Sequence, residues 1–229
     1  MGKDLKTAVV VGATGNLGRA VCDALVQRGY HLDPLWLNER HPDAASREAY
    51  KALPSPIHLA VYLAGVNVVE RMELLTDAQW DHVLDVNLKG AFLFAQAAFP
   101  ALCAARRSSL ITISSIMATH PYPGRTAYAA AKAGLEGLTR ALAIEWGPYG
   151  IATHCLRLGH LAGLMKSTAA NPQLLDEVKR HTPLAKLIEP EEVARYVCWL
   201  ADGGCHSVSG SVADFDPGYT INRWPLQTC

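Results

Sequence analysis

The chain has 229 residues, of which 50% are hydrophobic and 18% charged, and its formal net charge at pH 7 is zero. This length predicts one domain over residues 1–229, and the balanced charge argues against nucleic acid as a partner. The scattered cysteines contain no CxxC pair, and no signal peptide or membrane-length apolar stretch is recognised, so we expect a cytoplasmic protein with reduced thiols, no metal site and no membrane partner.

Apolar runs and amphipathic stretches alternate along the chain. In chain order, the predicted elements are a strand over 6–12, a helix over 17–28, a strand over 31–37, a helix over 43–53, a strand over 57–65, a helix over 76–105, a strand over 108–115, a helix over 126–146, a strand over 151–158, a loop-rich insert over 159–188, a helix over 189–200 and a strand over 208–215. Pro34 favours an edge position for the second strand, and the long helix is expected to bend near Asn87 and Pro100. The alternation predicts an α/β fold with one doubly wound parallel sheet.

Three motif residues stand at the ends of predicted strands, namely Gly12, Gly65 and Ser115. Ligands of such sheets bind beyond the carboxyl ends of the strands, so we expect these residues to converge on one edge. Gly12 also opens the turn Gly12-Ala-Thr-Gly15-Asn-Leu-Gly18 between a strand and a helix. Glycines there let a pyrophosphate approach the free N–H groups of the helix N-terminus. The alternative is a glycine-rich connection without a ligand.

Tyr128 and Lys132 are one helical turn apart, so they share a face. The ammonium is expected to lower the phenol pKa from its ordinary value near ~10, which would suit proton transfer at a carbonyl or alcohol oxygen. Ser115, at its strand end, can reach the same oxygen. A Tyr-x-x-x-Lys pair alone is common on helices, and it gains weight here from the motifs around it.

Together these motifs resemble those of the short-chain dehydrogenase/reductase family, over nearly the whole chain. The matching segments are 12–18, Asp85-Val-Asn87-Leu-Lys-Gly, Ile113-Ser-Ser115, 127–135 and Pro190-Glu-Glu-Val-Ala194. The resemblance implies a Rossmann-like fold and an NAD- or NADP-dependent oxidoreductase acting on a small-molecule carbonyl or alcohol. It also implies a homodimer or homotetramer with long helices at the interface.

The family pattern implies a role for each matching residue. Tyr128 would be the general acid and base, and Lys132 would lower its pKa and bind the nicotinamide ribose. Ser115 would polarise the substrate carbonyl, and Asn87 would hold a water that links Lys132 to a proton relay. The implied cofactor-binding residues are Gly12, Thr14, Gly15, Asn16, Leu17, Gly18, Ala64, Gly65, Tyr128, Lys132, Gly159 and Leu161.

The chain departs from the family pattern at both ends of the expected dinucleotide site. Between the glycine turn and Gly65 it is about one strand–helix unit shorter than usual, so the residue that normally reads the adenosine ribose has no clear match. Trp36 falls near that position, where Asn38, Glu39 or Arg40 could substitute. The other departures are Leu63, Leu158-Gly159, Gly163 and Asp216-Pro217-Gly218. Two alternatives therefore stay open: a lyase or dehydratase that uses Ser115 and Tyr128 without hydride transfer, and a non-catalytic binding protein with a degenerate cofactor site.

The segment 160–187 is expected to cover the substrate, since long loops at strand ends often act as lids. It mixes apolar and basic residues, which indicates a partly apolar carbonyl or alcohol of modest size. His120, Tyr122 and His160 lie near the catalytic end of the chain. For the histidines, contact with substrate and plain solvent exposure are both open.

Overall fold

The computed structural model describes residues 6–32, 44–163, 172–202 and 207–222. Within these ranges, six parallel strands form one sheet in the order β2-β1-β3-β4-β5-β6. The strands are β1 (Thr7–Val11), β2 (His31–Leu32), β3 (Leu59–Tyr62), β4 (Ser108–Ser115), β5 (Ile151–Leu158) and β6 (Ser211–Phe215). The predicted α/β fold with a doubly wound parallel sheet is confirmed, because the strand order reverses at β1.

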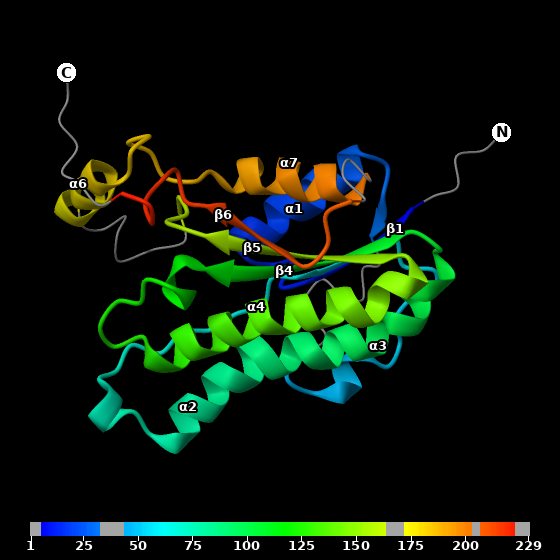
Figure 1. Ribbon diagram of the computed structural model, residues 1–229, viewed down its shortest axis with the longest axis horizontal. Coiled ribbons are helices and arrows are strands. Elements are labelled where there is room, and N and C mark those ends of the chain that lie inside the picture. The colour runs from blue at the N-terminus through cyan, green and yellow to red at the C-terminus, as the bar shows by residue number, and fades with distance from the viewer. Residues whose placement is uncertain (1–5, 33–43, 164–171, 203–206, 223–229) are drawn as a thin grey trace.

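Helices cover both faces of the sheet (Figure 1). On one face α1 (Asn16–Gln27) packs against α7 (Pro190–Ala201), and the other face carries α3 (Gly90–Ala104) and α4 (Thr126–Trp146). The remaining helical elements are η2 (Arg47–Tyr50), η3 (Met72–Leu74), α2 (Asp77–Leu84), η4 (Asp85–Lys89), η5 (Ile116–Ala118), η6 (Gly147–Tyr149) and α6 (Pro172–His181).

The unbroken apolar runs of the strands follow from this two-faced burial. Val9 lies in the core that contains Phe94 of α3, and the next residue, Val10, lies in the core that contains Leu25 of α1. Successive strand side chains point to opposite faces, so a strand buried on both sides is apolar at every position.

The predicted helix over 43–53 is wrong for the residues described, which form only the short 3-10 helix η2. The Tyr50 hydroxyl donates a hydrogen bond to the Ala44 carbonyl at 2.7 Å, and the Tyr50 ring packs on Phe94. This packing turns the segment back toward the sheet after four helical residues, and 3-10 helices are used in such short pieces. The last strand also begins later than predicted, at Ser211, after Gly210 with its positive φ of 73°.

Of the predicted strand over 31–37, only His31 and Leu32 are described, and they pair with β1 at the edge of the sheet. Trp36, Asn38, Glu39 and Arg40 lie outside the described residues. The shorter adenosine half therefore stays a prediction. The described cysteines, Cys22, Cys103, Cys155 and Cys198, are free thiols.

The long predicted helix is present from Asp77 to Ala104, and the expected bend at Asn87 takes the form of a π turn, η4, between α2 and α3. The Tyr62 hydroxyl donates a 2.5 Å hydrogen bond to the Val86 carbonyl inside this turn. By length and composition alone this helix could cross a membrane, contrary to the sequence expectation, yet half of its most apolar stretch is buried in the protein and α3 contacts β3 and β4.

Candidate active site

Three adjacent strands bring the sequence motifs to one edge, as predicted. β1 pairs with β3 and β3 with β4, all parallel, so Gly12, Gly65 and Ser115 follow neighbouring strand ends. The backbones after β1 and β3 touch, since a Cβ on Gly12 would lie 2.7 Å from the Ala64 nitrogen. Figure 1 shows the chain leaving β4, β5 and β6 at this same end of the molecule.

The glycine turn combines two tight positions with one open position. A Cβ on Gly18 would lie 2.2 Å from the Gly12 carbonyl oxygen, so Gly18 is fixed by the packing of the helix onto the turn. A Cβ on Gly15 would meet nothing closer than that oxygen at 3.5 Å. Gly15 caps α1 and lies exposed between Thr14 and Asn16, while Leu17 is buried in the core.

An exposed glycine at a helix N-terminus, with its free N–H groups, is the environment that a pyrophosphate requires. The residues of this turn therefore fit a dinucleotide. Asn16 adds one contact, because its side-chain amide donates a 3.3 Å hydrogen bond to the Ala162 carbonyl in the segment after β5.

Tyr128, Lys132 and Ser115 meet as the sequence predicts. The Lys132 Nζ lies 5.5 Å from the centre of the Tyr128 ring, and the Ser115 hydroxyl lies close enough to the Tyr128 side chain to lower its pKa. Lys132 is 4% exposed and donates a 2.8 Å hydrogen bond to the Ile113 carbonyl. Burial lowers the pKa of Lys132 to about 8, so the amine is poised near neutral pH.

The net shift of the Tyr128 pKa is opposite in direction to the one expected from the Lys132 charge alone. Burial has the largest effect and raises the pKa of Tyr128, while the Ser115 hydroxyl and the charge of Arg125 offset only part of the rise. The physical reason is that a buried phenolate loses its hydration, and the Lys132 ammonium points to the Ile113 carbonyl. The phenol of Tyr128 is therefore protonated at neutral pH.

Asn87 lies fully buried in the π turn, beside Lys132. Its Nδ2 donates to the carbonyls of Val66 at 2.7 Å and Val83 at 2.9 Å, and its Oδ1 is a buried acceptor without a hydrogen-bond partner among the described residues. A Cβ on Gly65 would lie 2.8 Å from that oxygen and 3.5 Å from the Lys132 Nζ. Gly65 thus leaves room beside an unpaired acceptor and an ammonium, which is where a polar ligand or a water would be bound.

Gly159 and Leu161 follow the end of β5. A Cβ on Gly159 would lie 3.0 Å from the Asp216 Cα, so this glycine lets the segments after β5 and β6 approach closely. The Leu161 side chain is buried in the core and the residue pairs with Ile188. Leu161 can therefore serve a cofactor only through its backbone.

Sequence reasoning missed an ion pair beneath this site. Arg157 of β5 binds Glu136 of α4 with two hydrogen bonds, and Asp214 of β6 with one at 2.7 Å. The Ser114 hydroxyl hydrogen-bonds to Glu136 at 2.9 Å and to the Lys132 carbonyl at 3.2 Å. An arginine within the predicted buried strand 151–158 was the available signal, because buried charges are paired.

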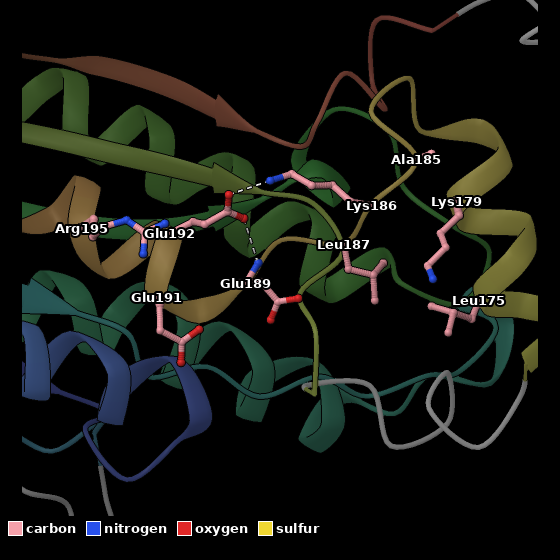
Figure 2. Close-up of a pocket in the computed structure, with 9 residues that line it drawn as sticks. All are labelled: Leu175, Lys179, Ala185, Lys186, Leu187, Glu189, Glu191, Glu192 and Arg195. Carbon is pink, nitrogen blue, oxygen red and sulfur yellow. Dashed lines mark hydrogen bonds and ion pairs between the residues drawn. The ribbon is translucent and has the colours of Figure 1, made fainter.

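A pocket of about 520 Å³ lies between α6 and the start of α7 (Figure 2). Its lining residues are Leu175, Lys179, Ala185, Lys186, Leu187, Glu189, Glu191, Glu192 and Arg195. Lys186 pairs with Glu192 at 2.6 Å, and Glu192 also accepts from the Glu189 backbone as part of a capping box. Five of its nine lining residues belong to the segment 160–187 that was expected to cover the substrate, whereas none of the predicted catalytic or cofactor-binding residues lines it.

The chain is similar to known proteins over most of its length. A family model described as Enoyl-(Acyl carrier protein) reductase matches residues 38–220. The chain is 27% identical to an NAD-dependent glycerol dehydrogenase of Listeria innocua, over 94% of each chain. It is 32% identical to a (3R)-3-hydroxyacyl-CoA dehydrogenase of Canis lupus familiaris, over 92% of this chain and 95% of the other.

Solved structures agree with the sequence relatives. The structure of a putative NAD(P)-dependent gluconate 5-dehydrogenase from Beutenbergia cavernae, with bound NADP, superposes with a TM-score of 0.86. The two chains are 25% identical, and the match covers 94% of this chain and 97% of the other.

Proposed function

Because the chain belongs to the short-chain dehydrogenase/reductase family and is an NAD(P)-dependent oxidoreductase, we propose that it interconverts a carbonyl and an alcohol by hydride transfer, with Tyr128 as general acid and base. The observation that carries the proposal is the meeting of Tyr128 with Ser115 and Lys132 beside the unpaired Asn87 oxygen. The names of the relatives above are those of dehydrogenases of alcohols, which supports this substrate class.

Tyr128 and Ser115 have different roles at the substrate oxygen. In reduction, the Tyr128 hydroxyl gives its proton to that oxygen while the Ser115 hydroxyl donates a hydrogen bond to it. In oxidation, the same phenol oxygen takes the proton back. The raised pKa of Tyr128 favours the proton-donating form at neutral pH.

Lys132 and Asn87 extend the path of the proton away from Tyr128. The Lys132 ammonium has a pKa of about 8 and can exchange a proton near neutral pH. The buried Asn87 oxygen is free to accept a hydrogen bond from a water that Lys132 also reaches, since both atoms border the space at Gly65. Gly12, Thr14, Gly15, Asn16 and Gly18 would hold the pyrophosphate, with Gly159 and the Leu161 backbone toward the nicotinamide.

A bound nicotinamide dinucleotide supplies or accepts the hydride. Both NAD and NADP are candidates, because one relative is named NAD-dependent and one related structure has bound NADP. We further propose a homodimer through α3 and α4, whose Phe92 and Ile144 side chains are 42% and 80% exposed. Gel filtration that yields a monomer at micromolar concentration would contradict this assembly.

The test of the proposed reaction is a titration with NADH and NADPH that follows nicotinamide fluorescence, together with turnover of a panel of ketones and aldehydes. Tyr128→Phe is expected to bind the cofactor as the unaltered protein does and to lose turnover. Tyr149→Phe, at an exposed tyrosine on η6, is the matched control and keeps it. Absence of binding to either cofactor at millimolar concentration would rule the reaction out.

A further inference from the structure

Two adjacent residues of β4 contact Lys132 and the acid one helical turn after it. The Ile113 carbonyl accepts the 2.8 Å hydrogen bond from the Lys132 Nζ, and the Ser114 hydroxyl donates a 2.9 Å hydrogen bond to the Glu136 Oε1. Burial raises the pKa of the Cys155 thiol, and the charges of Glu136 and Lys132 shift it in opposite directions, so both charges lie near this thiol. A buried ammonium and a buried carboxylate of α4 are therefore close together against the sheet.

Lys132 and Glu136 nevertheless do not pair with each other. Residues four apart on a helix are neighbours, and a lysine and an acid at this spacing can form an ion pair. Lys89 and Asp85 form one in η4, at 3.0 Å. Among the residues that the structure describes, Lys132 has no ion pair, because its Nζ bonds to the Ile113 carbonyl and the Glu136 carboxylate bonds elsewhere. The lysine of the site is thus separate from the closest acid on its own helix.

Arg157 binds the Glu136 carboxylate from the neighbouring strand, β5. Its Nε and Nη2 each donate a 2.8 Å hydrogen bond, one to each carboxylate oxygen. Its Nη1 bonds to Asp214 of β6 at 2.7 Å, which holds the guanidinium from the other side. A contact with both oxygens is the geometry that an arginine provides and a lysine does not. Arg157 and Ser114 together therefore supply the hydrogen bonds and the positive charge that this buried carboxylate requires.

The electrostatics of Lys132 agree with this arrangement. Burial lowers its pKa to about 8, and Glu136 is not among the described groups that offset this fall. A carboxylate without another partner, one helical turn away, would raise that pKa, because opposite charges favour each other's ionised forms. The charge of Glu136 is therefore compensated by the guanidinium of Arg157. The titratable or polar groups near Lys132 are Tyr128 and Glu136 on α4, the uncharged Asn87 in η4 and Cys155 on β5, with Arg157 and Asp214 beyond Glu136.

We propose that Arg157 is a positioning residue for the reaction: by holding the Glu136 carboxylate at β5, it keeps the Lys132 ammonium out of an ion pair with Glu136 and in place beside Tyr128. Without Arg157, Lys132 is the nearest cation to Glu136, and its side chain turns along the helix, away from the space at Gly65. Arg157 acts through Glu136 and Lys132 and not on the substrate. This inference rests on the proposed function, since it concerns the lysine of the same site.

The direct readout is the pH at which Lys132 loses its proton. An NMR titration of the lysine side-chain signals measures this midpoint in the protein without cofactor, and Lys132→Met identifies the signal by its loss. In the unaltered protein the midpoint is expected near pH 8. In Arg157→Met the uncompensated charge of Glu136 should raise the midpoint by about one pH unit or more, which is about a tenfold increase in proton affinity.

A double variant separates the effect of charge from that of lost packing. Arg157→Met with Glu136→Gln lacks the carboxylate, so the midpoint should return to within about half a unit of that of the unaltered protein. Arg157→Gln serves if Arg157→Met does not fold, because its amide can still donate to Glu136, and it should shift the midpoint in the same direction. Arg140→Met, the same change at an exposed arginine of α4, is the control and should leave the midpoint unchanged. A midpoint that stays constant in both single variants of Arg157, or rises equally with and without the Glu136 carboxylate, overturns the proposal.

Cofactor binding and turnover connect this shift to the reaction. At pH 7 the dissociation constants for NADH and NADPH should rise about fivefold or more in Arg157→Met, because the ammonium has left its place, and should recover in the double variant. The kcat for ketone reduction should follow the same order. A shifted midpoint with unchanged binding and turnover would contradict the positioning role. If the unaltered protein neither binds nor uses these cofactors, the proposed function fails, while the titration of Lys132 still decides whether Arg157 keeps it out of an ion pair.

Discussion

Arg157 binds the Glu136 carboxylate with two hydrogen bonds of 2.8 Å each, one from Nε and one from Nη2. The pair joins β5 to α4 one helical turn after Lys132, and both side chains are largely buried, at 16% and 7% exposure. Ser114 completes the link by bonding to Glu136 and to the Lys132 carbonyl. This ion pair therefore helps apolar packing to hold the helical turn from Tyr128 to Lys132 in place against the sheet.

Removal of one partner of this pair should destabilise the protein strongly. Arg157→Met leaves the Glu136 charge buried and is expected to lower the free energy of unfolding by about 3 kcal/mol, measured by urea denaturation. Adding Glu136→Gln should recover part of the loss, because it removes the unpaired charge. Lys51→Met, which breaks the exposed Lys51–Glu48 pair, is the control and should cost less than about 1 kcal/mol. A loss that is no larger for Arg157→Met than for this control would contradict the expectation.

Alanine substitutions at two glycines of the turn, Gly18 and Gly15, should affect different properties: the first lowers stability and the second weakens cofactor binding. Gly18→Ala forces a Cβ to 2.2 Å from the Gly12 oxygen, so the melting temperature should drop clearly. Gly15→Ala has room in the protein, with its nearest contact at 3.5 Å, so its melting temperature should fall much less than that of Gly18→Ala, by no more than the cost of replacing glycine at the N-cap of α1. Because its methyl group would stand where the pyrophosphate approaches, its dissociation constant for the dinucleotide should rise about tenfold or more. Unchanged cofactor binding in Gly15→Ala would place the dinucleotide elsewhere.

The buried Lys132 should make stability depend on pH above neutrality. Its pKa falls from 10.5 to about 8 on folding. Between these values the unfolded chain binds the extra proton, so the free energy of unfolding rises with pH across that window. Relative to Lys132→Met, the unaltered protein should gain stability from pH 8 to pH 10.5, by at most about 3 kcal/mol. A difference between the two proteins that stays constant over this range would show that Lys132 is not desolvated.

The direction of the reaction should depend on pH through Tyr128. A raised pKa keeps the phenol protonated at neutral pH, so ketone reduction is expected to be nearly constant below neutrality, while alcohol oxidation should increase as pH rises and the phenolate forms. Ser115→Ala removes the hydroxyl that partly offsets this rise, so its oxidation profile should move to higher pH as well as lose rate. Initial rates in both directions across a pH series measure the effect, and a shift of the Ser115→Ala profile to lower pH would contradict it.

The sequence predicted most of the fold because its strands and helices are strongly patterned. The strands 108–115 and 151–158 and the helix 126–146 have the predicted bounds, and the three strand ends meet as expected. The helix over 43–53 failed because its length was decided by contacts with Tyr50 and Phe94, which local pattern does not contain. Tertiary packing routinely overrides propensity in such short segments.

The sequence predicted which residues form the candidate site, but it did not predict the direction of the Tyr128 pKa shift. Spacing placed Tyr128 beside Lys132, yet the sign of the Tyr128 pKa shift depends on burial, which the Tyr-x-x-x-Lys pattern does not report. Likewise, Tyr122 and His160 were noticed for their position, but Tyr219, 97 residues after Tyr122, joins them only through the fold.

The π turn at Asp85–Lys89 positions Asn87 and also constrains the number of residues between α2 and α3. An α-helix turns by about 100° per residue, so deletion of one residue from this turn would restore a regular helix and rotate α3 by that angle relative to α2. Either Asn87 would leave its contacts with Val66 and Val83, or Phe94 would leave the core. Insertions and deletions within this helix are therefore expected to disrupt either the site or the core, because a single extra residue in the π turn keeps Asn87 and Phe94 in register with each other.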